Sequence, residues 1–183
     1  MNQRHNFQTG FSLMELLVVL IIIGVAAGAV RLAMTDEAPM AEVERDAERL
    51  AYRFGQIQDR VLLSNRERGV LILRDELVFL DWREGDPMEG EPDIVWSESA
   101  STPNRWRGSE QTELALQLDG RWLELLPEPP EDERDWQPHL IIMPSEDYQP
   151  AFRLSLRHRE LMRGEVWVEG DGFNRLQVIR DTQ

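Results

Sequence analysis

The sequence predicts an α+β protein in which a long helical N-terminal region precedes a head of two antiparallel β-sheets. Three observations support this prediction. Residues 11–34 form an almost unbroken apolar run, residues 40–61 repeat apolar side chains at spacings of three and four, and the remainder alternates short β-like segments with turns. Helical periodicity followed by many short strands is typical of α+β proteins. About 150 residues follow the apolar run, which fits a single globular head.

Residues 11–34 are long enough to cross a bilayer as a helix. The apolar segment counts roughly 20 to 24 residues, and a helix rises about 1.5 Å per residue against a hydrocarbon core of about 30 Å. A cleaved secretory signal peptide is the alternative, with VAAGAV at 25–30 as its cleavage region. Glu15 argues against that alternative, because a carboxylate within a membrane costs about 2.5–3.5 kcal/mol and usually has a partner. Arg31 follows about 24 Å farther along, where it can reach the opposite interface.

The junction before this run resembles the class III signal of type IV pilins and type II secretion pseudopilins. A short polar leader ends at Gly10, Phe11 follows, and Glu15 comes four residues later. The resemblance implies that a prepilin peptidase cuts between Gly10 and Phe11 and that Phe11 becomes N-methylphenylalanine. It further implies that Glu15, in the first turn of a helix where an acid is favoured, neutralises the terminal amine of a neighbouring filament subunit. The alternative is that Glu15 lies at headgroup level without a role.

Residues 35–65 are predicted to form an amphipathic helix, in which Pro39 either introduces a kink or occupies the first turn. The apolar stripe lasts only about three heptads, so packing of this helix on a sheet is favoured over a coiled coil. The pilin resemblance implies the same plan, with an inserted first half of the helix and a second half embedded in the head. The stripe consists of Met40, Val43, Ala47, Leu50, Phe54, Ile57 and Val61.

Residues 66–183 are predicted to be β-rich. Two hairpins are expected, one joined at Arg74–Glu76 and one around Asp119–Gly120, which is the strongest hairpin signal in the chain. We expect about seven or eight short strands in an α+β head of two antiparallel sheets. The other strand candidates are 139–143, 151–158, 165–172 and 174–180, the last two joined at 170–172. Exposed loops rich in Pro, Gly and acidic residues are expected at 84–93, 98–111 and 127–138.

Composition and spacing argue against several function classes. The chain has 20 basic residues, all arginine, against 34 acidic ones, and its net charge of −14 opposes binding to nucleic acid or anionic lipid. It has no cysteine. The histidines (5, 139 and 158) are too scattered for metal-ligand spacing, and the acidic segments 145–147 and 169–174 lack the repeated carboxylates of a calcium loop. The six tryptophans are interpreted as packing residues. We predict no enzymatic activity, no cofactor and no metal site.

Two further segments resemble the minor pseudopilin H group. They are the helix-to-strand passage at 44–70 and the chain end at 164–183. The domain of this group is shared with FimT/FimU-type minor pilins. The resemblance implies a leader at 1–10, a transmembrane and assembly helix at 11–34, an amphipathic second half at 35–65 and a periplasmic head at 66–183. It implies a single-pass subunit of the bacterial inner membrane whose N-terminus is cytoplasmic before processing. It also implies that this subunit links the tip subunits of a type II secretion pseudopilus to the shaft. The implied partners are other minor pseudopilins, the major pseudopilin, the prepilin peptidase and the inner-membrane assembly platform.

A minor pilin of a type IV pilus is the alternative function, because the two machines use near-identical subunits. A DNA-binding version of it needs a basic stripe that neutralises phosphates. The nearest candidates are Arg153, Arg157, Arg159 and Arg163. The acidic head opposes this function, and no nucleic-acid partner is predicted.

Overall fold

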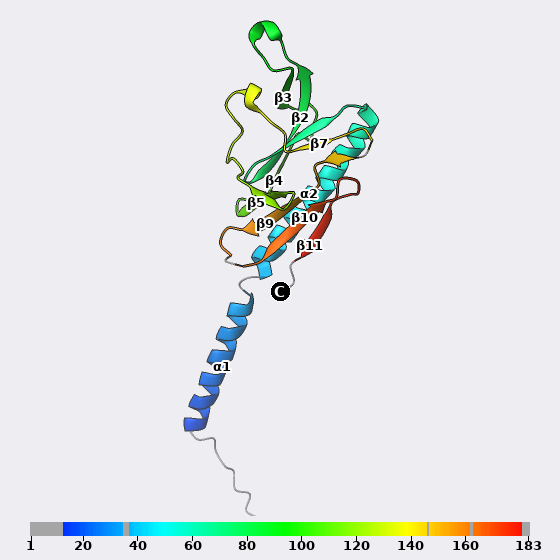
Figure 1. Ribbon diagram of the computed structural model, residues 1–183. Helices are drawn as coiled ribbons and strands as arrows, with labels where there is room; N and C mark the ends of the chain where they lie inside the picture. The colour runs from blue at the N-terminus through cyan, green and yellow to red at the C-terminus, as the bar shows by residue number, and fades with distance from the viewer. Residues whose placement is uncertain (1–12, 35–36, 146, 162, 181–183) are drawn as a thin grey trace, which may run out of the picture. The chain divides into compact units, whose positions relative to one another are not determined.

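The computed structural model describes residues 13–34, 37–145, 147–161 and 163–180. Within these residues the chain forms two long helices, α1 (Leu13–Met34) and α2 (Glu37–Ser64), and eleven strands. Two short 3-10 helices, η1 (Pro87–Glu89) and η2 (Glu133–Asp135), lie in the loops. The chain divides into two compact units, Met1–Ala38 and Pro39–Gln183, and the second contains every described strand (Figure 1).

The described strands form two antiparallel sheets, as predicted. Sheet A has the spatial order β3 (Ile94–Glu98), β2 (Glu76–Glu84), β1 (Arg68–Ile72), β7 (Leu140–Ile142) and β8 (Tyr148–Gln149), and β4 (Arg105–Arg107) also pairs with β2. Sheet B has the order β11 (Gln177–Arg180), β10 (Glu165–Gly170), β9 (Phe152–His158), β5 (Thr112–Leu118) and β6 (Arg121–Leu123).

Helix α2 packs its apolar stripe against both sheets, which confirms that the stripe faces a sheet. Figure 1 shows α2 running through the head beside β10 and β11. Pro39 lies in the first turn of the helix, the second of the two placements expected for it. The stripe residues Val43, Ala47, Leu50, Phe54, Ile57 and Val61 are at most 1% exposed, and Met40 packs at the margin. They share one core with side chains of sheet A (Val70, Phe79, Ile142) and of sheet B (Leu116, Leu154, Val168).

Both predicted hairpins are present. Strands β1 and β2 pair around the turn that contains Arg74 and Asp75. Strands β5 and β6 are joined by Asp119 at φ 49° and Gly120 at φ 75°. Two consecutive positive φ angles are typical of the type I′ turn, whose twist matches that of the flanking strands, and glycine adopts the second of these positions without strain.

The structure corrects two of the loop predictions. Strand β4 lies within 98–111, and its central residue Trp106 is 5% exposed and belongs to the main core. In 127–138, Trp136 is 7% exposed and packs with Leu71 and Leu80 in a second cluster on the other face of sheet A. The expectation of fully exposed loops is therefore wrong for these two segments. With β3, β4 and β8 added, the described strands also outnumber the seven or eight expected.

His139 joins β7 to β1 through its ring. The backbone N–H of Ile72 donates to Nδ1 of His139 at 3.0 Å, and the backbone N–H of His139 donates to the carbonyl of Val70 at 2.8 Å. Burial lowers the pKa of His139, which favours the neutral ring whose Nδ1 can accept this hydrogen bond.

Acidification from about pH 7 to pH 5 is expected to lower the free energy of unfolding of the head. Because the pKa of His139 lies below its unfolded value of about 6.5, the unfolded state binds the proton first. The stabilisation by His139 is therefore present above the pKa of the unfolded state and is lost as the pH falls below that pKa. Denaturant unfolding at a series of pH values measures the loss. In His139→Asn, whose Oδ1 accepts the same N–H at any pH, the loss should be smaller; an equal loss in both proteins contradicts the prediction.

Candidate assembly site

The predicted assembly residues lie at and before the start of α1. Helix α1 begins at Leu13 and has Glu15 in its first turn, where the positive end of the helix dipole favours a carboxylate. Gly10 and Phe11 lie outside the described residues. Side chains 13–28 are all exposed, and most of them are apolar. A helix that is apolar all round requires an apolar environment or a partner.

Among the described residues, no helix combines the length and the apolar character needed to cross a membrane.

Asp46 fixes α2 to the turn that precedes β5. Its side chain is 0% exposed and accepts hydrogen bonds from the backbone N–H of Ser109 and from Oγ1 of Thr112, both at 2.7 Å. Arg49 supplies a third hydrogen bond from the same helix. Burial raises the pKa of Asp46, but the three hydrogen bonds outweigh it, and the pKa lies below its usual value. The ionised carboxylate therefore holds the N-terminal half of α2 against sheet B.

Arg175 fixes the C-terminal half of α2 to the segment between β10 and β11. Its Nη1 donates to the carbonyl of Gly55 at 2.5 Å, and Nη2 pairs with Asp59. A Cβ at position 55 would lie 2.9 Å from Nη1, so the glycine leaves room for the guanidinium group. Asp46 and Arg175 together position α2 in the head.

The flank of α2 turned away from its apolar stripe is the candidate docking surface of the head. Tyr52 is 70% exposed and Leu63 is 86% exposed. A shallow hollow of about 550 Å³ on this flank is lined by Glu42, Arg45, Asp46, Glu48, Arg49 and Tyr52. Charged side chains of both signs with exposed apolar ones among them are typical of the rim and centre of a protein interface.

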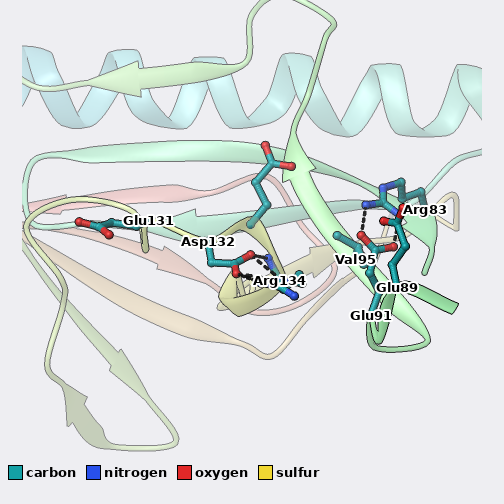
Figure 2. Close-up of a pocket in the computed structure, with 8 residues that line it drawn as sticks. Arg83, Glu89, Glu91, Val95, Glu131, Asp132 and Arg134 are labelled. Carbon is teal, nitrogen blue, oxygen red and sulfur yellow. Dashed lines mark hydrogen bonds and ion pairs between the residues drawn. The ribbon is translucent and has the colours of Figure 1, made fainter. Parts of the chain in front are cut away.

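A second hollow, of about 580 Å³, lies between the loops around η1 and η2 (Figure 2). Arg83 donates two hydrogen bonds of 2.6 Å to Glu91, and Arg134 pairs with Asp132. These guanidinium groups lower the pKa of Glu91 and of Asp132 to about 2. The remaining charged lining residues are Glu89, Glu131 and Glu133. Since both arginines are neutralised within the hollow, its net charge is negative and disfavours anionic ligands.

The acidic turn at 169–174 is a structural turn. The Asp171 carboxylate accepts the backbone N–H groups of Phe173 and Asn174 and the side-chain amide of Asn174, which together hold its pKa at about 2. In the other acidic segment, Ser145 donates to Asp147, and residue 146 lies outside the described residues. Within the part of the chain that is described, no group of three or more His, Asp or Glu side chains could hold a metal ion.

The candidate arginine stripe for DNA carries mixed charge. Arg153 donates to Oε1 of Glu169 at 2.5 Å. Arg157 stands in register between Glu113 of β5 and Glu165 of β10. Arg159 and Arg163 follow and are exposed. Two of the four arginines are thus flanked by carboxylates on the sheet, which argues against a surface that neutralises phosphates.

Comparison with known proteins identifies the family. Residues 5–30 match the prokaryotic N-terminal methylation motif. The chain is 34% identical, over 176 residues, to type II secretion system protein H of Pseudomonas aeruginosa, with 93% of this chain and 96% of the relative covered. The chain belongs to the type II secretion system protein H family. Protein H of Aeromonas hydrophila is 27% identical over 188 aligned positions, covering 98% of each chain.

Three solved structures share the fold of this chain. The minor pseudopilin EpsH of Vibrio cholerae matches in two structures, with TM-scores of 0.55 and 0.56 at 18% and 20% identity. These matches cover 78% and 77% of this chain and 99% and 97% of the EpsH chains. The solution structure of Escherichia coli GspH matches with a TM-score of 0.52 at 15% identity, covering 78% of this chain and 94% of that one. The chain therefore shares the fold of EpsH and GspH, and its membership of the type II secretion system protein H family favours secretion over the type IV pilus alternative.

Proposed function

We propose that this minor pseudopilin joins a type II secretion pseudopilus near its tip and links the tip subunits to the shaft. The observation that carries the proposal is the methylation motif at residues 5–30, together with Glu15 in the first turn of the apolar helix α1. In this proposal residues 1–10 are the leader, 11–34 the membrane and assembly helix, 35–65 its amphipathic second half and 66–183 the periplasmic head.

Glu15 supplies the driving force for assembly in the membrane. A carboxylate within hydrocarbon is costly unless a cation accompanies it. After cleavage before Phe11, the new terminal amine of a neighbouring subunit is such a cation, and the pair forms only when subunits assemble. The same segment anchors the subunit in the inner membrane by a single span, with the head in the periplasm.

The head supplies the contacts that place the subunit. Asp46 and Arg175 hold α2 so that its exposed flank, with Tyr52 and Leu63, faces other subunits. The partners of this surface are the other minor pseudopilins and the major pseudopilin, while the prepilin peptidase and the assembly platform act on the N-terminal segment. The protein has no catalytic role of its own and is a substrate of the peptidase. No cofactor and no nucleic acid enter this function.

Mass spectrometry of the membrane-extracted protein is expected to find a mature chain that begins with N-methylated Phe11. Gly10→Leu should leave the precursor uncut, because the peptidase must accommodate the last leader residue in a confined site. Gly10→Ala is the matched control and should still be processed in part. A wild-type chain that begins at Met1, or near Ala29 as a secretory signal would give, contradicts the proposal.

A further inference from the structure

Two tryptophans meet on the face of sheet B that is turned away from α2. Strand β10 directs Val166 and Val168 into the core, so Trp167 between them faces outward. Trp122 of the edge strand β6 reaches the same face, and the two ring centroids are 5.7 Å apart with a 41° angle between the planes. Trp122 is 55% exposed.

Small side chains on the intervening strands allow this contact. Ala115 of β5 and Ser155 of β9 stand in register with each other and with Trp167, so Trp122 can reach Trp167 across two strands. Ile179 of β11, the register partner of Trp167, is 39% exposed and extends the apolar area. Trp122, Trp167 and Ile179 are called the tryptophan platform below.

A polar hollow of about 630 Å³ borders the tryptophan platform. Four of its lining residues form one row across the outward face, in the register order Gln117, Arg153, Glu169 and Gln177. Arg153 connects hollow and platform, since its guanidinium carbon lies 4.8 Å from the ring centroid of Trp167 while its Nε donates to Glu169. Planar amide, guanidinium and carboxylate groups therefore stand beside the exposed indole of Trp122, while the Arg153 guanidinium covers part of the Trp167 ring.

We propose that the tryptophan platform and this hollow bind a neutral oligosaccharide of equatorial pyranoses. Such a ring presents a flat C–H face, which can lie on the exposed indole of Trp122, and a rim of hydroxyl groups, which planar side chains can bind in both donor and acceptor roles. The hollow falls in the range of about 300–1,000 Å³ that small-ligand sites occupy. A second sugar ring placed in the hollow would meet Gln117 and Arg153, which stand on neighbouring strands.

Charge on this face selects a neutral ligand. Arg153 is paired with Glu169, and Arg157 stands between Glu113 and Glu165. This face is thus nearly balanced in charge within a chain of net charge −14. Neither a cation nor an anion gains much attraction here.

The size of the platform favours a saccharide over a protein partner. Only three partly exposed apolar side chains form it, whereas a standard protein interface uses about 20–30 residues from each partner. Arg153 and Glu169 beside it are already paired within the head, and removing them from water on docking would cost free energy without a new pair. This inference does not depend on the docking function proposed for α2.

Saturation-transfer NMR with chitotetraose as the probe tests the proposal, using the full-length protein in a detergent without a sugar headgroup. We expect saturation of the ring C–H protons of the probe and a dissociation constant of about 1 mM or tighter. Trp122→Ala and Trp167→Ala should each weaken binding about tenfold or more. Trp82→Ala is the matched control, because Trp82 is a 36% exposed tryptophan on sheet A, and it should bind as the wild type does.

Trp122→Phe distinguishes loss of the binding contact from loss of the fold. It keeps a flat ring on the edge strand, so it should bind the probe only a few-fold more weakly. Absence of saturation transfer at about 10 mM probe overturns the proposal, as does transfer that persists unchanged in Trp122→Ala. If the probe does not bind but Trp122→Ala loses binding to other pseudopilin heads, the platform is a protein docking surface and the saccharide proposal is overturned.

Discussion

Asp46→Ala is expected to lower the free energy of unfolding of the head by about 2–4 kcal/mol. The substitution removes the acceptor of Ser109 N–H and Thr112 Oγ1–H, of which Thr112 is fully buried and Ser109 is partly buried. Alanine favours a helix slightly more than aspartate, which offsets only a few tenths of a kcal/mol. Denaturant unfolding followed by circular dichroism measures the change.

Glu48→Ala is the matched control for this substitution. Glu48 lies on the same helix, and its side chain is 63% exposed, so the control should change the free energy of unfolding by no more than about 0.5 kcal/mol. The pKa of Asp46 is lowered in the fold, so its contribution is present above the unfolded value of about 3.9 and is lost as the pH falls below it. The free energies of unfolding of the wild type and of Asp46→Ala should therefore converge in strong acid. Equal stabilities of Asp46→Ala and Glu48→Ala at neutral pH would contradict the prediction.

The elements predicted correctly from the sequence are those whose signals are local. The apolar stripe of α2 repeats within one helix, and an apolar helix face in a globular head must be buried whatever covers it. The turn at Asp119 and Gly120 is equally local, because two positive φ angles and the twist they impose depend on those two residues alone.

The missed elements depend on contacts between distant parts of the chain. Strand β4 has only three residues and becomes a strand because Trp106 pairs opposite Leu77 of β2. Trp136 sits in an acidic, proline-rich segment and is buried only because sheet A has a second apolar face to cover. Asp46 looks like an ordinary charged helix residue, since the turn that buries it lies 63 residues later at Ser109.

The tryptophan platform illustrates the same limit. Trp122 and Trp167 each resemble a packing residue of a strand, as do all six tryptophans when the sequence is taken alone. Trp96, Trp106 and Trp136 do pack in the two cores. The exposed pair arises from register, because the strands between them place Ala115 and Ser155 in the same row as Trp167. No periodicity within one strand indicates which residues of a neighbouring strand will stand beside it.

The assembly motif at residues 5–30 is of another kind, because in the proposed function a peptidase reads it as a short linear segment before any fold is needed. In the same proposal a second subunit completes its function, so the residues that carry it are recognisable in the sequence while their contacts would lie between chains. Glu15 therefore stands in α1 with its side chain exposed, in a unit distinct from the head.

Glu15→Gln is expected to leave cleavage and the fold of the head unchanged and to reduce incorporation into the pseudopilus by about tenfold or more. The head unit contains none of the α1 residues, so its stability does not depend on position 15. The amide keeps the size of the side chain but cannot neutralise an ammonium group in the membrane, and an unpaired buried charge costs several kcal/mol, of which about 1.4 corresponds to a factor of ten.

The fraction of the subunit recovered in sheared pseudopili, relative to the processed subunit in the membrane, measures this effect. Glu15→Asp is the matched control: it keeps the negative charge with a shorter reach and should restore part of the incorporation. If Glu15→Gln incorporated as well as the wild type, the carboxylate would have no role in assembly and would serve only as a polar group at the membrane surface. If Glu15→Asp failed as completely as Glu15→Gln, the geometry of the side chain rather than its charge would control docking. Partial recovery with aspartate and loss with glutamine is the result that a charge pair across subunits requires, because only the charge is shared by the two carboxylates.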